Sequence, residues 1–157
     1  MKGSTLMGGL LVFTAVFSGA LWYAQNYAYY EVTETEEFDL QMTRLDGDLA
    51  PAPARGFTIL DAWTSPLKFR ACFNMEESLP ALRETYQPYA DAEPLMPPGW
   101  FDCFDTEALH ADLEEGRAVA FLGQRDISEG IDRVIAVYPD GRAYSWHQLN
   151  EKYADER

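Results

Sequence analysis

The chain has 157 residues and a net charge of −14, from 12 Lys/Arg and 26 Asp/Glu. Only Lys2 among these charged residues precedes position 31, so residues 31–157 hold 11 basic against 26 acidic side chains, a net charge of −15. This charge excludes nucleic acid and anionic lipid as favourable partners, whereas a basic protein would be attracted, with a strong dependence on ionic strength. The length of this part suits one modest domain.

Residues 1–30 are predicted to form a transmembrane anchor. No ionisable side chain lies between Lys2 and Glu31, and this stretch is long enough to cross a hydrocarbon core of about 30 Å. Aromatic residues expected at the membrane interface follow the apolar run; they are Trp22, Tyr23 and Tyr27. Lys2 on one side and acidic residues on the other predict a cytoplasmic N-terminus, with the remaining chain outside.

A cleaved signal peptide is the alternative for this segment. Lys2, the apolar run and the triplet Ser18-Gly19-Ala20 imitate the three parts of such a peptide. Apolar and aromatic residues continue beyond Ala20, which favours a retained anchor. Both interpretations export the domain.

Small residues recur along the predicted transmembrane helix. Gly8, Ala15 and Gly19 fall near one face, and small residues at such spacing let two helices approach closely. Small residues are also common in transmembrane helices that pack against nothing. The sequence favours a face that packs against a partner helix.

The exported part is expected to comprise an acidic linker at 31–37, an α+β domain at 38–149 and a polar tail at 150–157 that frays. Alternating apolar and polar residues predict strands. Pro139-Asp140-Gly141 predicts a hairpin turn between the last two. The predicted strands cover 38–43, 57–60, 67–73, 119–122, 133–138 and 143–149.

Two short helices are predicted between these strands. Ser78 or Asn74 can cap the first, which accepts Pro80 in its first turn and ends near Pro88. A proline-rich loop follows up to Trp100. Asp105 is the expected N-cap of the second helix, and Gly116 is placed where a glycine would end it. The order of elements predicts a mostly antiparallel sheet with two short helices.

Cys72 and Cys103 are the two cysteines, and both lie in the exported part. In an oxidising compartment two such residues pair, and a disulfide over this span contributes on the order of 3–4 kcal/mol. A metal site is the weaker alternative, because no C-x-x-C or H-x-x-H spacing occurs. We expect a disulfide, no metal and no cofactor.

No motif typical of nucleophilic or acid–base catalysis is present, so no catalytic residue is assigned. Trp100, Trp146 and His147 are candidate partner contacts, since exposed aromatic residues often dominate interfaces. For the segment around Trp100, packing of its aromatic residues into the core is the favoured alternative. His147 on its own is expected at the surface or partly hydrogen-bonded.

Four blocks of the sequence resemble a family of small, uncharacterised single-pass membrane proteins of alphaproteobacteria, catalogued only as a domain of unknown function. The blocks are 70–73 (RACF), 98–105 (PGWFDCFD), 130–134 (GIDRV) and 139–148, which contains PDGRAY and WHQ. The resemblance implies a bacterial inner-membrane protein with a periplasmic domain. It implies no activity.

Three functions remain open at this point. The leading hypothesis is a non-enzymatic accessory or assembly subunit of an inner-membrane complex, with a respiratory complex as the expected type and a basic protein such as a cytochrome c as an expected neighbour. The second is a periplasmic metal carrier or enzyme that uses His147 and acidic residues. The third is a membrane-anchored scaffold or sensor.

Overall fold

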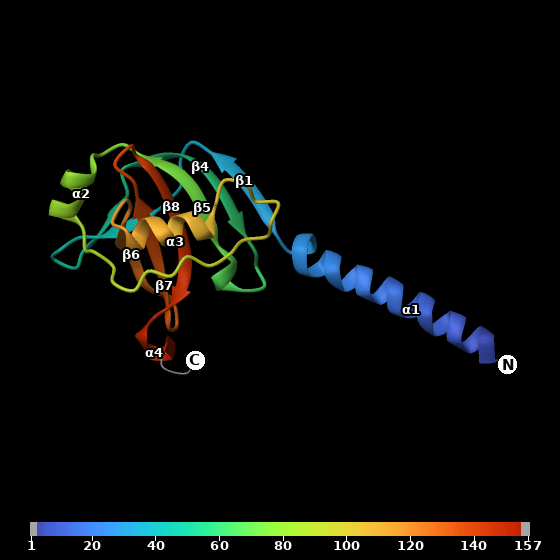
Figure 1. Ribbon diagram of the computed structural model, residues 1–157. Coiled ribbons are helices and arrows are strands. Elements are labelled where there is room, and N and C mark those ends of the chain that lie inside the picture. Colours follow the sequence, from blue (N-terminus) through green and yellow to red (C-terminus); the bar gives the residue numbers. More distant parts are fainter. Residues whose placement is uncertain (1–2, 155–157) are drawn as a thin grey trace. The chain divides into compact units, whose positions relative to one another are not determined.

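The computed structural model describes residues 3–154 and divides the chain into two units, which meet between Tyr30 and Glu31 (Figure 1). The first unit is the helix α1 (Gly3–Tyr23), extended by one π-helical turn, η1 (Ala24–Ala28). Among the described residues this is the one helix long and apolar enough to cross a membrane. No other described part of the chain buries the large apolar side chains of α1, which are all exposed.

The second unit contains a six-stranded antiparallel sheet, so the predicted α+β class is confirmed. In spatial order the strands are β1 (Glu31–Thr35), β4 (Ala54–Asp61), β5 (Arg70–Met75), β8 (Arg142–Leu149), β7 (Ile131–Val137) and β6 (Val119–Ser128). A second sheet pairs β2 (Gln41–Thr43) with β3 (Leu49–Pro51). The helical segments are η2 (Pro66–Lys68), α2 (Leu79–Thr85), α3 (Thr106–Glu114) and α4 (Glu151–Ala154).

Both faces of the large sheet are covered. The main core lies on one face, where side chains from the sheet meet those of β2, β3 and α2; it includes Leu40, Met42, Phe57, Phe69, Phe73, Leu82, Phe121, Ile135 and Val137. The long loop before α3, and α3 itself, cross the other face (Figure 1). Every residue of β7 is buried as a result, the polar ones included.

The helix and turn signals of the sequence are confirmed. Ser78 occupies the N-cap of α2, and the Asp105 carboxylate accepts a hydrogen bond from the Ala108 amide at the start of α3. Gly116 follows the C-cap of α3 with φ +74°, a conformation that glycine adopts without strain. Gly141 has φ +92° in the turn between β7 and β8.

The predicted linker at 31–37 is wrong, because most of it forms the strand β1. Glu31 pairs with Asp61 and Thr35 with Phe57, so β1 is an edge strand of the main sheet. Its acidic side chains indicated a linker, but an edge strand that is solvated on both sides accommodates charge readily. The domain therefore begins directly after Tyr30.

The fraying tail at 150–157 is also corrected within its described part. Asn150 is 3% exposed, and residues 151–154 form the one-turn helix α4. The remaining residues of the predicted tail lie outside the described part of the chain. Asn150 is held in place by a polar network on the sheet, described below.

Candidate functional site

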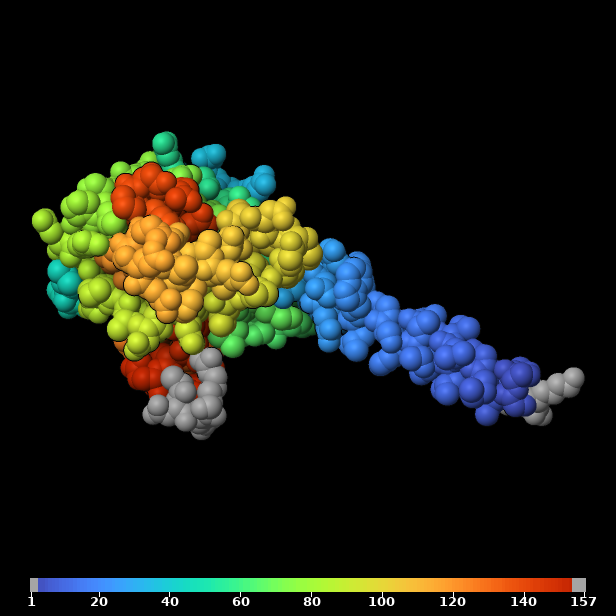
Figure 2. Space-filling view, viewed as in Figure 1, coloured from blue at the N-terminus to red at the C-terminus, as the bar shows by residue number. Residues whose placement is uncertain are grey.

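A broad groove of about 1280 Å³ opens on the face of the sheet that α3 covers. One wall is the loop 87–93 and the other is α3, which run beside each other on this side of the domain (Figure 2). β6 and the end of β8 contribute the floor and the far end. The residues that line these parts are Gln87–Glu93, His110, Leu113, Glu114, Ala118–Ala120, Leu122, Arg125 and Gln148–Glu151.

The loop wall is fixed to the sheet by hydrogen bonds. The Tyr89 amide donates to Ala120 at 2.9 Å, and the Leu122 amide donates to Gln87 at 3.0 Å. Proline at position 88 is tolerated between these bonds because its missing N–H would point away from β6. The buried side-chain amide of Gln148 adds two more bonds: it accepts from the Glu93 amide and donates to the Asp91 carbonyl. The wall is therefore a fixed feature of the fold.

The groove combines an apolar floor with an acidic rim. Ala118, Ala120 and Leu122 of the β6 region line it and are buried. Within residues 3–154, four carboxylates line it, from Asp91, Glu93, Glu114 and Glu151, against one arginine, Arg125. Such a surface attracts a cationic segment that also carries apolar groups.

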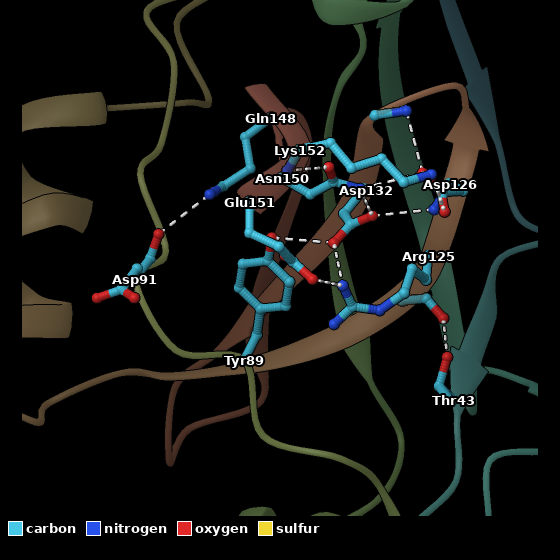
Figure 3. Close-up of polar contacts among 12 residues, drawn as sticks. Thr43, Tyr89, Asp91, Arg125, Asp126, Asp132, Gln148, Asn150, Glu151 and Lys152 are labelled. Atoms are coloured by element: carbon cyan, nitrogen blue, oxygen red, sulfur yellow. Dashed lines mark hydrogen bonds and ion pairs between the residues drawn. The ribbon is translucent and has the colours of Figure 1, made fainter. Parts of the chain in front are cut away.

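Behind the groove lies the carboxylate of Asp132, which is fully buried (Figure 3). It accepts hydrogen bonds from the Asp126 amide and the Asn150 side chain, each at 2.9 Å, and from the Tyr89 hydroxyl at 3.1 Å. The Arg125 guanidinium lies 3.6 Å away and bonds Glu151 at 2.7 Å. The buried charge therefore joins the loop wall to β6, β7 and the end of β8.

Burial and the neighbouring Asp132 carboxylate both raise the pKa of Tyr89 above its usual value of 10. The phenol therefore stays protonated at any physiological pH and acts as a permanent donor to Asp132. This hydrogen bond fixes the loop wall of the groove above the sheet.

A second carboxylate, Asp126, extends this network toward the surface. It accepts hydrogen bonds from the Gly130 amide, from Asn150 and from the Lys152 ammonium, and the bond from Lys152 is the first cause of its lowered pKa. Its φ of +48° turns β6 so that its own amide points at Asp132. These contacts explain why Asn150 and α4 are ordered.

On the opposite face of the sheet, a buried cluster of Arg133, Phe69 and His147 packs together. Arg133 donates from Nε to His147 Nε2 at 3.0 Å, and its guanidinium lies 4.7 Å from the ring centre of Phe69, which stacks on His147. His147 Nδ1 lies 2.6 Å from the Pro66 carbonyl, the geometry of a donor. Burial, then the Arg133 charge, lower the pKa of His147 to about 4.

The burial of two residues corrects part of the predicted partner contact. Trp146 is fully buried and His147 is 5% exposed, so neither side chain is available to a partner. Trp100 is half-buried, whereas its neighbours Phe101 and Phe104 are buried in the domain. The favoured alternative, in which the aromatic residues of this segment pack into the core, is confirmed for Phe101 and Phe104.

The disulfide between Cys72 and Cys103 is confirmed. It ties β5 to the loop that leads into α3, on the groove side of the sheet. No cluster of three or more His, Cys, Asp or Glu suited to a metal occurs in residues 3–154. Both ring nitrogens of His147 are already engaged.

The residues assigned to the membrane helix lie on α1 and η1. Gly8, Ala15 and Gly19 are exposed there, as are Trp22 and Tyr23 on the helix and Tyr27 on η1. Their packing against a partner helix or the membrane interface remains a prediction.

Sequence reasoning missed the groove and the residues behind it. Asp132 and Arg125 lie among many acidic and basic residues, and Tyr89 lies in a proline-rich loop. The available signal was the position of Asp132, which lies directly before the predicted strand 133–138 and next to a second charge, Arg133. A charge at such a position needs buried partners.

Comparison with protein-family models shows that the chain belongs to a family of unknown function, DUF6446, whose model matches residues 40–156. The match spans almost the whole second unit and includes every residue of the groove and of the Asp132 network. No curated protein and no solved structure matches the chain.

Proposed function

We propose that this member of DUF6446 is a non-enzymatic, membrane-anchored accessory or assembly subunit of a bacterial inner-membrane complex. In this proposal α1 spans the membrane with its N-terminus in the cytoplasm, and the domain lies in the periplasm and binds a basic segment of the partner in its groove. The resemblance to alphaproteobacterial single-pass proteins supports the location. A respiratory complex that contains a cytochrome remains the expected type.

The observation that carries the proposal is the acidic groove with its apolar floor. Its loop wall is held by four hydrogen bonds to β6 and Gln148, so the groove exists before a partner binds. The carboxylates of Glu114 and Glu151 are 70% and 75% exposed and remain accessible to a cation. Apolar contacts from the floor would add affinity that does not depend on salt.

A metal carrier or enzyme centred on His147 has no observation in its favour, because this imidazole is buried and hydrogen-bonded at both nitrogens. A free-standing scaffold or sensor differs from the leading proposal only in lacking a stable partner. Copurification therefore separates these functions.

The test compares two charge-reversed proteins after gentle detergent extraction. Glu93→Lys with Glu114→Lys reverses two charges in the groove, and Glu77→Lys with Glu84→Lys reverses two exposed charges near and in α2. We expect the first pair to reduce recovery of the partner by about tenfold, roughly 1.4 kcal/mol, and the second to leave it nearly unchanged. Equal losses in both would show that only bulk charge matters, and the absence of any stoichiometric partner would overturn the accessory role.

The membrane part of the proposal is tested in the same preparation. Replacing Ala15 or Gly19 with Leu blocks close helix approach while keeping the helix apolar, whereas Val12→Leu is the matched control. We expect loss of the partner in the first two variants only. A reporter that works only in the periplasm, fused after Arg157, is expected to be active.

A further inference from the structure

One end of the main sheet is the end at which the chain enters the domain. Glu31 pairs with Asp61 at the end of β4, and Leu60 pairs with Arg70 at the start of β5. β1 begins with the residue that follows Tyr30, the last residue of the apolar unit. If α1 spans a bilayer, no linker separates the bilayer from this end of the sheet.

The connection from β4 to β5 lies at this same end and carries Trp63. This side chain is 85% exposed, the highest value among the large hydrophobic residues described. The connection is well fixed: the Ala62 amide donates to the Asp61 carboxylate, and the Leu67 amide donates to the Ser65 hydroxyl at the start of η2. Ala62 itself is buried, so the loop directs Trp63 outward from a firm base.

A second exposed apolar side chain, Met96, belongs to a neighbouring loop and is 72% exposed. The buried Arg70 joins the two loops. Its guanidinium donates to the Leu95 carbonyl at 2.5 Å and to the Leu67 carbonyl at 2.7 Å. The loops that carry Trp63 and Met96 are therefore both hydrogen-bonded to the buried Arg70.

We propose that this end of the domain rests on the membrane and that Trp63 lies in the headgroup region of the bilayer, with Met96 also facing the bilayer from the loop that Arg70 holds. Indole is amphipathic and favours the membrane–water interface, where its ring is partly buried and its N–H stays hydrated. Glu31 and Asp61 at the same end outnumber Lys68 of η2 and disfavour anionic lipid, so the fitting surface is zwitterionic. The proposal rests on α1 being a span, as in the proposed function.

The consequence is a domain held against the bilayer at two points, the covalent connection at Glu31 and the side chain of Trp63. This limits how far the domain can tilt above the membrane. The groove would then be presented to its partner at a defined height, which lowers the orientational cost of binding.

The experiment uses the full chain in phosphatidylcholine nanodiscs whose lipids carry bromine either near the headgroup or near the chain ends. Bromine quenches tryptophan emission at short range. Difference spectra between the wild type and Trp63→Phe isolate the emission of Trp63, and Trp22→Phe isolates that of Trp22 within α1. Iodide in the buffer measures access from water.

We expect Trp63 emission to be shifted to the blue, quenched more by headgroup bromine than by chain-end bromine, and protected from iodide. Emission from Trp63 that is insensitive to bromine and fully open to iodide would overturn the proposal. Quenching of Trp22 separates the two failures. If bromine quenches Trp22 and not Trp63, α1 is in the bilayer but the domain does not rest on it through Trp63. If bromine quenches neither, α1 is not a membrane anchor.

Discussion

Asp132 and Arg133 are adjacent residues of β7 with opposite charges, and they are buried on opposite faces of one sheet. Alternation along the strand directs Asp132 to the groove side and Arg133 to the main core. The carboxylate accepts three hydrogen bonds from a backbone amide, an asparagine and a tyrosine. The guanidinium instead rests on aromatic rings and has a neutral imidazole as acceptor.

The comparison shows two different ways to bury a charge. A carboxylate needs several donors, and three distant segments supply them, so Asp132 also organises the groove. A guanidinium loses less on dehydration because its charge is spread over a plane that packs on aromatic faces. Burial still lowers the pKa of Arg133 to about 10. Removal of Asp132 therefore leaves more polar groups unpaired than removal of Arg133.

The largest expected effect follows from replacing each residue with an apolar one. Asp132→Ala removes the acceptor of the Tyr89 hydroxyl and of the Asp126 amide, and one of the two acceptors of the Asn150 side chain. We expect it to lower the free energy of unfolding by about 3–5 kcal/mol. Arg133→Met keeps most of the side-chain bulk and leaves only the His147 acceptor unpaired, so about 1–3 kcal/mol is expected. Urea unfolding of the detergent-solubilised protein, followed by tryptophan fluorescence, measures both.

Hydrogen exchange measures which segments lose protection when Asp132 is replaced. Asp132→Ala should increase exchange in the loop 87–93, whose Tyr89 has lost its partner, while β2 and β3 remain protected. Equal losses of stability in both variants, with no local change in exchange, would contradict the difference drawn between the two charges.

The second prediction concerns pH and the cationic side of the comparison. His147 has a pKa of about 4 in the folded protein, below the ordinary 6.5, so the unfolded chain takes up this proton first as the pH falls. The part of the free energy of unfolding that depends on neutral His147 is fully present above pH 6.5. It is lost as the pH falls from 6.5 to about 4. The shift corresponds to roughly 3 kcal/mol.

The matched variant is His147→Gln, which can still accept a hydrogen bond from Arg133 but does not titrate. Its stability should fall less than that of the wild type over this pH range. Parallel stability curves for the two proteins would show that His147 does not control acid sensitivity. Three carboxylates have lowered pKa values, so their protonation reduces stability only at more acidic pH; they are Asp112, Asp126 and Asp140.

Local sequence signals were sufficient for most of the fold. The caps Ser78 and Asp105, the turn at Gly141 and the cysteine pairing depend on residues near in sequence or on chemistry alone, and the structure confirms them. The strand β1 was missed, because five residues rich in glutamate resemble a linker unless the pairing with β4 is known.

The candidate site depended on packing that the sequence does not display. Alternation along β5 places Arg70 on the face opposite Phe69 and Phe73, but it does not show that the loop before α3 covers that face and leaves Arg70 only 4% exposed. His147 was misjudged for a similar reason, since η2 and Phe69 enclose it. The groove joins Glu93 to Gln148, 55 residues apart, and no local pattern reports such a contact.

The smallest expected effect comes from Arg125, the cationic neighbour of Asp132, which reaches solvent. Its side chain is 49% exposed, lies 3.6 Å from Asp132 and shares its charge with the exposed Glu151. Arg125→Gln leaves the three hydrogen bonds to Asp132 intact, so we expect it to cost less than about 1 kcal/mol. The same change removes the one arginine among the described residues that line the groove, so binding of a basic partner should become slightly tighter and more sensitive to salt. Unfolding in urea and partner recovery at two ionic strengths measure these opposite changes. A loss of stability as large as that of Asp132→Ala would mean that the ion pair, and not the hydrogen bonds, holds the buried carboxylate, and the two faces of β7 would then handle charge in the same way.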